Sequence, residues 1–189
     1  MKESIPVRSP LSLPFARSYW VDPGHLMAGA YPGSSRPEEA PSKLIGLLDA
    51  GITSVISLME QQERNHSGQP FVDYSEGITH MAHARGLRVV CFRHSVVDGS
   101  VPSLEVMKGI LDGIDEALNA GGRTYVHCWG GRGRTGTAVC CWMIRHGIVA
   151  PNQAVEHLQT LIRHNAQAFY PTPEFETQRD FVRNWIKGQ

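Results

Sequence analysis

The sequence of 189 residues has little of what defines several classes of protein. Four cysteines, two of them adjacent, are too few for a disulfide framework and are typical of a reducing compartment, so we expect a cytoplasmic protein. Lys plus Arg and Asp plus Glu both number 18, without the basic excess of a nucleic-acid-binding protein. No apolar run approaches the roughly 20 residues of a membrane-spanning helix, and no secretory signal is recognisable, so we expect no membrane insertion.

The sequence does contain an alternation of short β-branched runs and amphipathic segments. Strands are predicted at residues 52–58, 87–92 and 123–127, with a strand-turn region at 19–33. Helices are predicted at 37–50, 72–85, from the cap Ser103 to Gly121, from Arg134 to His146, at 151–163 and at 173–187. This pattern is typical of an α/β fold with a mostly parallel central sheet flanked by helices on both faces. We expect one domain over residues 19–189, preceded by a loose arm over residues 1–18.

The loop after the third predicted strand combines a cysteine with a glycine-rich turn. It reads HCWGGRGRTG over residues 127–136. Its glycines allow backbone N–H groups to turn inward around an anion at the start of a helix, where Cys128 loses its proton easily. Arg134 adds a planar fork for two oxygens of a phosphate. The cradle is predicted to comprise Trp129, Gly130, Gly131, Arg132, Gly133 and Arg134.

This loop resembles the C-x5-R-S/T signature of the cysteine-dependent protein tyrosine and dual-specificity phosphatases. The resemblance is strongest over residues 94–146. Within the family, the sequence is most similar to the group that includes the kinase-associated and mitotic-exit phosphatases. It implies hydrolysis of a phosphorylated protein or small phosphomonoester through a phosphocysteine on Cys128, with no cofactor and no metal. Cleavage of a phosphate ester needs an acid for the leaving oxygen. The segment VVDGSVPS resembles the general-acid loop of this family, which makes Asp98 the expected acid.

Four further residues have expected supporting roles. The resemblance implies that the Thr135 hydroxyl hydrogen-bonds the sulfur, and Thr135 is also a candidate helix N-cap. It also implies that His127 orders the loop and favours the thiolate. Gln178 resembles a glutamine that places the hydrolytic water, the alternative being an exposed helical residue without a role. Glu60 could brace Arg134 by an ion pair, but a solvated surface carboxylate is the favoured reading.

The remaining candidates concern substrate preference, metals and redox chemistry. Arg132 is not required by the chemistry, and at the rim it is expected to favour substrates with a second negative charge. His80 and His83 stand three apart in a predicted helix, but lack evident partner ligands and are expected to be surface residues. The other cysteines are expected to pack in the interior, a redox role being the alternative for the first: Cys91, Cys140 and Cys141.

Three alternative functions stay open. A phosphoinositide or inositol-phosphate phosphatase would have the same fold and catalytic residues. A catalytically silent phosphate-binding module is disfavoured by the complete set of Cys128, Arg134 and Asp98. A sulfur-transfer or arsenate-reducing enzyme would need sulfur donors or resolving thiols.

Overall fold

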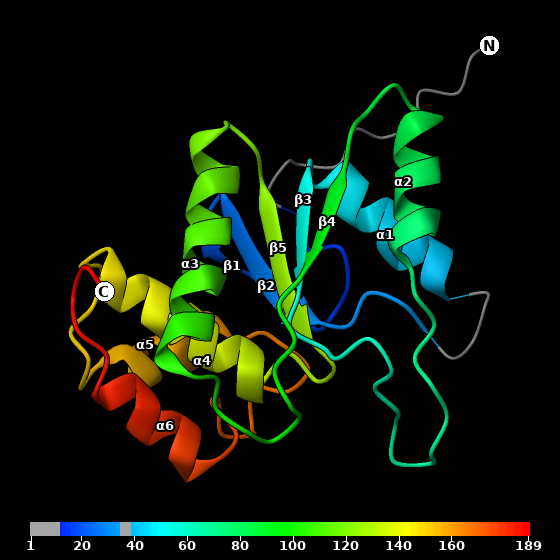
Figure 1. Cartoon of the computed structure of the whole chain (residues 1–189). Coiled ribbons are helices and arrows are strands. Elements are labelled where there is room, and N and C mark those ends of the chain that lie inside the picture. Colours follow the sequence, from blue (N-terminus) through cyan, green and yellow to red (C-terminus); the bar gives the residue numbers. More distant parts are fainter. Residues whose placement is uncertain (1–11, 35–38) are drawn as a thin grey trace.

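The computed structural model describes residues 12–34 and 39–189. Its five strands form one sheet with the order β1-β2-β5-β3-β4 (Figure 1). β2, β5, β3 and β4 are parallel, while β1 pairs antiparallel with β2, so the predicted mostly parallel sheet is confirmed. The strands are β1 (Ser18–Asp22), β2 (Leu26–Ala30), β3 (Ser54–Ser57), β4 (Val90–Arg93) and β5 (Thr124–Cys128).

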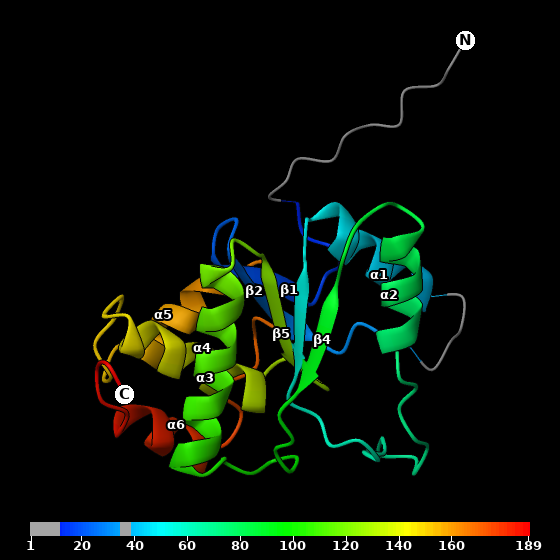
Figure 2. The same ribbon diagram turned by 45° about the horizontal axis from the view of Figure 1, so that its top comes forward.

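Helices cover both faces of this sheet, which confirms the α/β class. α1 and α2 lie on one face, and α3 to α6 lie on the other (Figures 1 and 2). In the described ranges, no helix has both the length and the apolar character needed to cross a bilayer. The helices are α1 (Ala40–Asp49), α2 (Ser75–His83), α3 (Leu104–Asn119), α4 (Gly133–Arg145), α5 (Ala154–Leu161) and α6 (Glu176–Arg183).

α3 shows how local sequence determines these elements. Its predicted cap, Ser103, accepts a hydrogen bond from the Val106 N–H at 3.2 Å, which satisfies one of the free donors of the first turn. The buried face of this helix consists of Met107, Ile110, Leu111 and Ile114. Leu104 lies in the first turn and is 53% exposed.

α4 is the central helix of the layer that it shares with α3, α5 and α6. All its residues from Gly133 to Ile144 are buried. Cys140 and Cys141 are fully buried within it, as expected, and burial raises the pKa of both thiols. Because α4 is packed on all sides, the position of its N-terminus is fixed. The glycine-rich loop leads directly into this N-terminus.

Several predicted boundaries differ from the structure. Most elements are shorter than predicted: β4 covers Val90–Arg93 rather than 87–92, and α5 covers Ala154–Leu161 rather than 151–163. The expected arm over 1–18 ends too late, since Ser18 belongs to β1 and the Phe15 ring packs edge-on against Tyr125 at 6.0 Å. Residues 1–11 of this arm, and residues 37 and 38 of the first predicted helix, lie outside the described residues.

Candidate active site

The loop after β5 passes directly into α4 at the carboxyl edge of the sheet, the lower edge in Figure 1. Cys128 ends β5 and is 3% exposed, and α4 begins at Gly133. The free N–H groups at the start of a 13-residue helix carry partial positive charge, which stabilises an anion there. The structure therefore places the thiol beside the positive end of α4, as the sequence predicts.

One glycine of this loop is required by its close approach to β2. Gly131 has a φ of +78°, and a Cβ added there would lie 2.5 Å from the carbonyl carbon of Gly29. The backbone N–H of Tyr31 donates to the Trp129 carbonyl oxygen at 3.0 Å. The loop is thus fixed against the end of β2, and a larger residue at position 131 would push it away.

Arg134 connects the loop after β5 with the loops that follow β3 and β4. Its guanidinium is buried; Nη1 donates to Glu63 Oε2 at 2.7 Å and Nη2 to Glu63 Oε1 at 2.8 Å. Nη1 also donates to the Val96 carbonyl oxygen at 2.9 Å. Burial alone lowers the pKa of Arg134, but hydrogen bonding to Glu63 and the charges of Cys128, Glu63 and Asp98 outweigh it and raise that pKa. The site therefore has a fixed, permanently charged fork.

One edge of this fork remains for a ligand. Within the described residues, Arg134 Nε is buried and has no hydrogen-bond partner. The neighbouring Nη2 lies 2.7 Å from Oδ1 of Asp98, whose side chain is 54% exposed and lies on the loop after β4. Nε–H and Nη2–H together match two oxygens of a phosphate. A phosphate bound there would satisfy Nε and displace the Asp98 carboxylate from Nη2.

The structure brings Asp98 to Arg134 from the loop after β4, although β3 lies between β4 and β5 in the sheet. Cys128, Arg134 and Asp98 therefore come from two loops that converge across β3.

Glu63 is the residue that sequence reasoning missed. Glu60 is the brace of Arg134 considered above, with a surface position as the favoured alternative, and Glu60 is indeed exposed. Glu63 lies three residues later, and its side chain is only 6% exposed. The loop turns back between them, as shown by the hydrogen bond from the Glu60 N–H to Glu63 Oε2 at 3.1 Å. A second acid in the same loop was the available signal.

His127 is a fully buried, neutral residue beneath the loop. Its Nδ1 lies 3.1 Å from the Cys128 carbonyl oxygen, and its Nε2 is hydrogen-bonded to the Tyr74 hydroxyl. The ring stacks on Tyr125 with centroids 5.8 Å apart. Burial lowers the pKa of His127 to about 3, against a smaller opposite effect of the Cys128 hydrogen bond. These contacts fit the expected ordering of the loop, since they hold the backbone of Cys128 in place.

Thr135 and Gln178 are both buried at the start of α4, in roles that differ in part from those expected. The Thr135 hydroxyl lies 3.5 Å from the Gly29 carbonyl oxygen, and the N-cap position of α4 belongs to Arg132, so the N-cap assignment of Thr135 is wrong. Gln178 was weighed as an exposed residue, but it is fully buried and an added Cβ on Gly133 would meet its amide at 2.9 Å. Thr135 therefore contacts β2, and Gln178 lies against Gly133, the first residue of α4.

Arg132 does not extend freely from the rim, contrary to expectation. Its Nη2 pairs with Glu174 Oε1 at 3.2 Å, and its guanidinium carbon lies 4.8 Å from the centre of the Tyr170 ring. Only 18% of its side chain is exposed. The extra positive charge of the loop is thus already neutralised by the segment that precedes α6. Trp129, by contrast, packs edge-on against Phe71 with ring centroids 5.4 Å apart.

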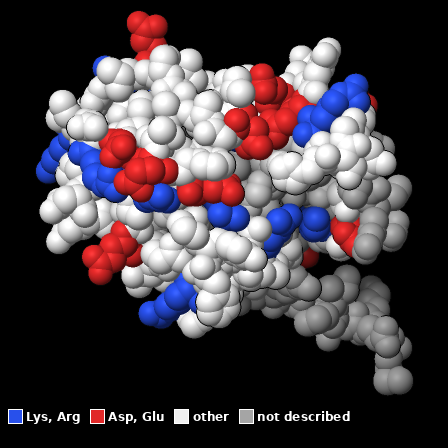
Figure 3. All heavy atoms as spheres, turned by 90° about the horizontal axis from the view of Figure 1, so that it is seen from below, with Lys and Arg blue, Asp and Glu red and all other residues white. Residues whose placement is uncertain are grey.

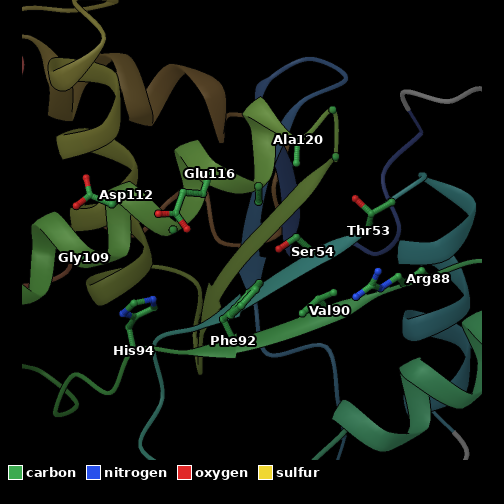
Figure 4. A pocket seen from close by; sticks show the side chains of 14 residues that line it. Thr53, Ser54, Arg88, Val90, Phe92, His94, Gly109, Asp112, Glu116 and Ala120 are labelled. Carbon is green, nitrogen blue, oxygen red and sulfur yellow. The ribbon is translucent and has the colours of Figure 1, made fainter.

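Charge is mixed on the face of the molecule that contains the site (Figure 3), and a separate groove lies between α3 and β4. On the carboxyl-edge face, acidic and basic side chains are interspersed, and neither sign covers it (Figure 3). A groove of about 890 Å³ lies between α3 and β4, with Val90 and Phe92 from the strand and Glu116 from the helix among its lining residues (Figure 4). Neither Cys128 nor Arg134 lines this groove.

Metal-binding and disulfide chemistry find no support in the described ranges. Over residues 12–34 and 39–189, no group of three or more His, Cys, Asp or Glu side chains could hold a metal ion. His80 and His83 lie at the surface of α2, as expected. All four cysteines are free, and Cys91 is half-buried in β4, where burial raises the pKa of its thiol. Cys128 is thus distinguished from the other cysteines by its position at the start of a helix beside Arg134.

Comparison with protein families and solved structures gives a consistent result. Residues 15–182 match the family described as "PTP-SAK: Swiss Army Knife protein, DSP-PTPase phosphatase domain". The crystal structure of Tk-PTP in the active form is similar in fold, with a TM-score of 0.64 and 20% identity over 90% of this chain and 97% of that one. At this identity the similarity is one of fold.

Two curated relatives have a higher sequence identity to the chain than Tk-PTP does, but over shorter stretches. The chain is 30% identical over 121 residues to phosphatidylglycerophosphate phosphatase PTPMT1 of Arabidopsis thaliana, which is 64% of this chain and 32% of that protein. It is 44% identical over 55 residues to the tyrosine-protein phosphatase cdc-14 of Caenorhabditis elegans, 29% of this chain and 7% of that protein. The chain thus spans a third or less of the length of these relatives.

Proposed function

The chain belongs to the DSP-PTPase phosphatase domain family, and we therefore propose that it hydrolyses phosphomonoesters through a phosphocysteine on Cys128. The observation that carries this proposal is the open edge of the Arg134 guanidinium. Among the described residues its buried Nε has no hydrogen-bond partner, and its Nη2 holds Asp98, at the start of the helix that follows Cys128. One phosphoryl group at this edge would meet a nucleophile, two fork donors and an acid.

In the first step the Cys128 sulfur attacks phosphorus, and the bond from phosphorus to the leaving oxygen breaks. Asp98, in its protonated form, gives its proton to that oxygen, so an alcohol or phenol leaves rather than an anion. The backbone N–H groups of the loop over 129–134 and the Arg134 fork stabilise the equatorial oxygens. The product of this step is a phosphocysteine and a free alcohol.

In the second step water attacks the phosphorus of the phosphocysteine. Asp98 is now a carboxylate and accepts a proton from the water, while the bond between sulfur and phosphorus breaks. Inorganic phosphate leaves, and Cys128 returns to its thiolate form. We assign Thr135 to support of the departing sulfur and His127 to the order of the loop.

Hydrolysis of p-nitrophenyl phosphate with and without a metal chelator tests this proposal. We expect release of nitrophenol that the chelator does not alter and that Cys128→Ser abolishes. A silent phosphate-binding module would release none, and a sulfur-transfer or arsenate-reducing enzyme would turn over only with its own thiol or arsenate substrates. Hydrolysis that persists in Cys128→Ser would contradict the proposal.

We propose phosphorylated protein side chains as the preferred substrates, with phosphoinositides as the alternative. The similarity to the tyrosine-protein phosphatase cdc-14 supports the first, and that to the phosphatidylglycerophosphate phosphatase supports the second. The pairing of Arg132 with Glu174 favours the first, because it neutralises the charge that would attract a second phosphate. The four free cysteines support our assignment of the protein to the cytoplasm.

The variant Glu174→Gln distinguishes the two substrate classes. Release of Arg132 from its partner is expected to raise kcat/KM for phosphoinositides by a few-fold, since partly exposed ion pairs are worth about 0.2–1 kcal/mol. The kcat/KM for monophosphorylated peptides should change little. If wild-type protein already prefers phosphoinositides over phosphopeptides, the alternative substrate class is correct.

A further inference from the structure

Gln178 is a buried amide in a helix that is otherwise largely exposed. It is the third residue of α6, and its side chain has no exposed surface. Such an amide costs free energy unless its oxygen and its N–H groups have partners. Its Oε1 accepts from the Phe175 N–H at 3.1 Å, and its Nε2 donates to the Ser100 carbonyl oxygen at 3.1 Å. The first hydrogen bond lies within the N-terminal turn of α6, whereas the second connects α6 to a different loop.

The Ser100 contact ties α6 to the turn that carries Asp98. The Ser100 N–H and hydroxyl both donate to the Val97 carbonyl oxygen, at 3.1 and 2.7 Å. Gly99 has a φ of +73°, which a type II turn requires at its third position. Residues 97–100 thus form a turn with Asp98 at its second position. The last carbonyl group of this turn is held by Gln178.

The same amide also lies against the loop that follows Cys128. A Cβ added at Gly133 would lie 2.9 Å from Nε2 and 3.0 Å from Oε1 of Gln178. On the other side, a Cβ added at Gly99 would lie 3.4 Å from the Phe175 ring. The first turn of α6 therefore lies between the turn over residues 97–100 and the start of α4, and it keeps the two about one side chain apart.

Arg134 cannot maintain this spacing throughout the reaction. Its Nη2 holds Asp98 in the structure, but the same atom lies on the edge that a phosphoryl group would occupy. Once Nη2 binds substrate, the Asp98 carboxylate is free to turn toward the leaving oxygen. The hydrogen bond between Gln178 and Ser100 does not compete with substrate and persists.

We propose that Gln178 is a positioning residue that holds the Asp98 turn at a fixed distance from the Cys128 loop. This proposal rests on the proposed phosphatase function. It differs from placement of the hydrolytic water, because it concerns the proton given to the leaving group. It predicts that loss of the Gln178 amide harms the first step in proportion to how much the leaving group needs that proton.

The test compares Gln178→Met with wild type on phenyl phosphate and on p-nitrophenyl phosphate. Methionine has a similar length but no amide. We expect kcat/KM to fall roughly tenfold for phenyl phosphate, the equivalent of one positioning hydrogen bond, and far less for the nitrophenyl ester. The matched control is Val182→Ala, in the same helix and also fully buried, which should lower Tm without changing the ratio of the two substrates.

Equal losses for both substrates, or no loss, would overturn the proposal. A fall in kcat with unchanged kcat/KM, together with accumulation of phosphoenzyme, would assign Gln178 to the water step instead and also overturn it. If circular dichroism shows that Gln178→Met does not fold, Gln178→Glu replaces it, since this side chain keeps the acceptor for Phe175 but as a carboxylate cannot donate to Ser100. A wild-type protein that hydrolyses neither ester would refute the proposed function itself.

Discussion

Removal of Glu63 is expected to weaken both the stability and the turnover of the protein. The side chains of Glu63 and Arg134 are 6% and 1% exposed, and two hydrogen bonds of 2.7 and 2.8 Å join them. Removal of one partner of a buried ion pair costs about 3–5 kcal/mol, because the other charge stays buried without compensation. Asp98 and the Val96 carbonyl group still contact the guanidinium, which places Glu63→Ala near the lower limit.

Urea unfolding measures the first effect. Glu63→Ala should lower the free energy of unfolding by about 3 kcal/mol with an unchanged m-value. Glu60→Ala is the matched control, since Glu60 is exposed in the same loop and its removal should change the stability by less than about 0.5 kcal/mol. Glu63→Gln keeps the shape of the side chain and one hydrogen-bond acceptor. Its loss in the free energy of unfolding should lie between those of Glu63→Ala and Glu60→Ala.

Turnover measures the second effect. Without its brace the Arg134 fork loses its orientation, and a displacement of about 1 Å can cost roughly 10²-fold in rate. We expect this loss in kcat/KM for p-nitrophenyl phosphate with Glu63→Ala and no such loss with Glu60→Ala. If Glu63→Ala matches Glu60→Ala in both stability and turnover, Arg134 is held by other contacts and the brace is unimportant.

Three further predictions concern the acid, the nucleophile and the buried histidine. Asp98→Asn should lower kcat by roughly 10²- to 10⁴-fold for poor leaving groups and by less for nitrophenolate; equal losses would remove Asp98 from the acid role. Iodoacetate at pH 6 should alkylate Cys128 ahead of Cys91 and Cys140, whose thiols have pKa values raised by burial. Bound phosphate should protect Cys128 from alkylation. If mass mapping finds Cys91 or Cys140 alkylated first, the loop does not stabilise the Cys128 thiolate. His127, with its pKa lowered to about 3, stays neutral in the folded protein while the unfolded chain takes up a proton below about pH 6.5, so stability is lost as pH falls through this window. The slope attributable to His127 should be close to 1.4 kcal/mol per pH unit near pH 5 and should decline toward about pH 3. It should be absent from urea unfolding of His127→Gln; identical slopes would show that the imidazole protonates in the folded state.

The positions of the proposed nucleophile loop and of the proposed acid could be predicted from the sequence because their signals are local. The cysteine, the glycines and Arg134 lie within seven consecutive residues, and the structure places them at the end of β5 and the start of α4. The strand and helix order was also predictable, since apolar periodicity changes from one element to the next. The antiparallel pairing of β1 with β2 was not, because a short strand-turn region does not reveal its partner.

The contacts between distant loops could not be predicted. Whether Glu60 or Glu63 meets Arg134 depends on how the loop after β3 turns back, and no spacing rule gives that path. The position of Arg132 depends on Glu174 and Tyr170, more than 35 residues away. Gln178 is buried because α6 packs against α4. In each case tertiary packing decides the surroundings of a polar side chain.

The phosphocysteine is the central claim, and rapid-quench mass spectrometry tests it most directly. Wild-type protein is mixed with p-nitrophenyl phosphate, quenched in acid within the first turnover and digested for peptide mapping. We expect one added phosphoryl group on the peptide that contains Cys128, a larger amount of it in a variant slowed in the second step, and none in Cys128→Ser. Steady hydrolysis by wild type with no phosphorylated Cys128 peptide at any quench time would contradict the account.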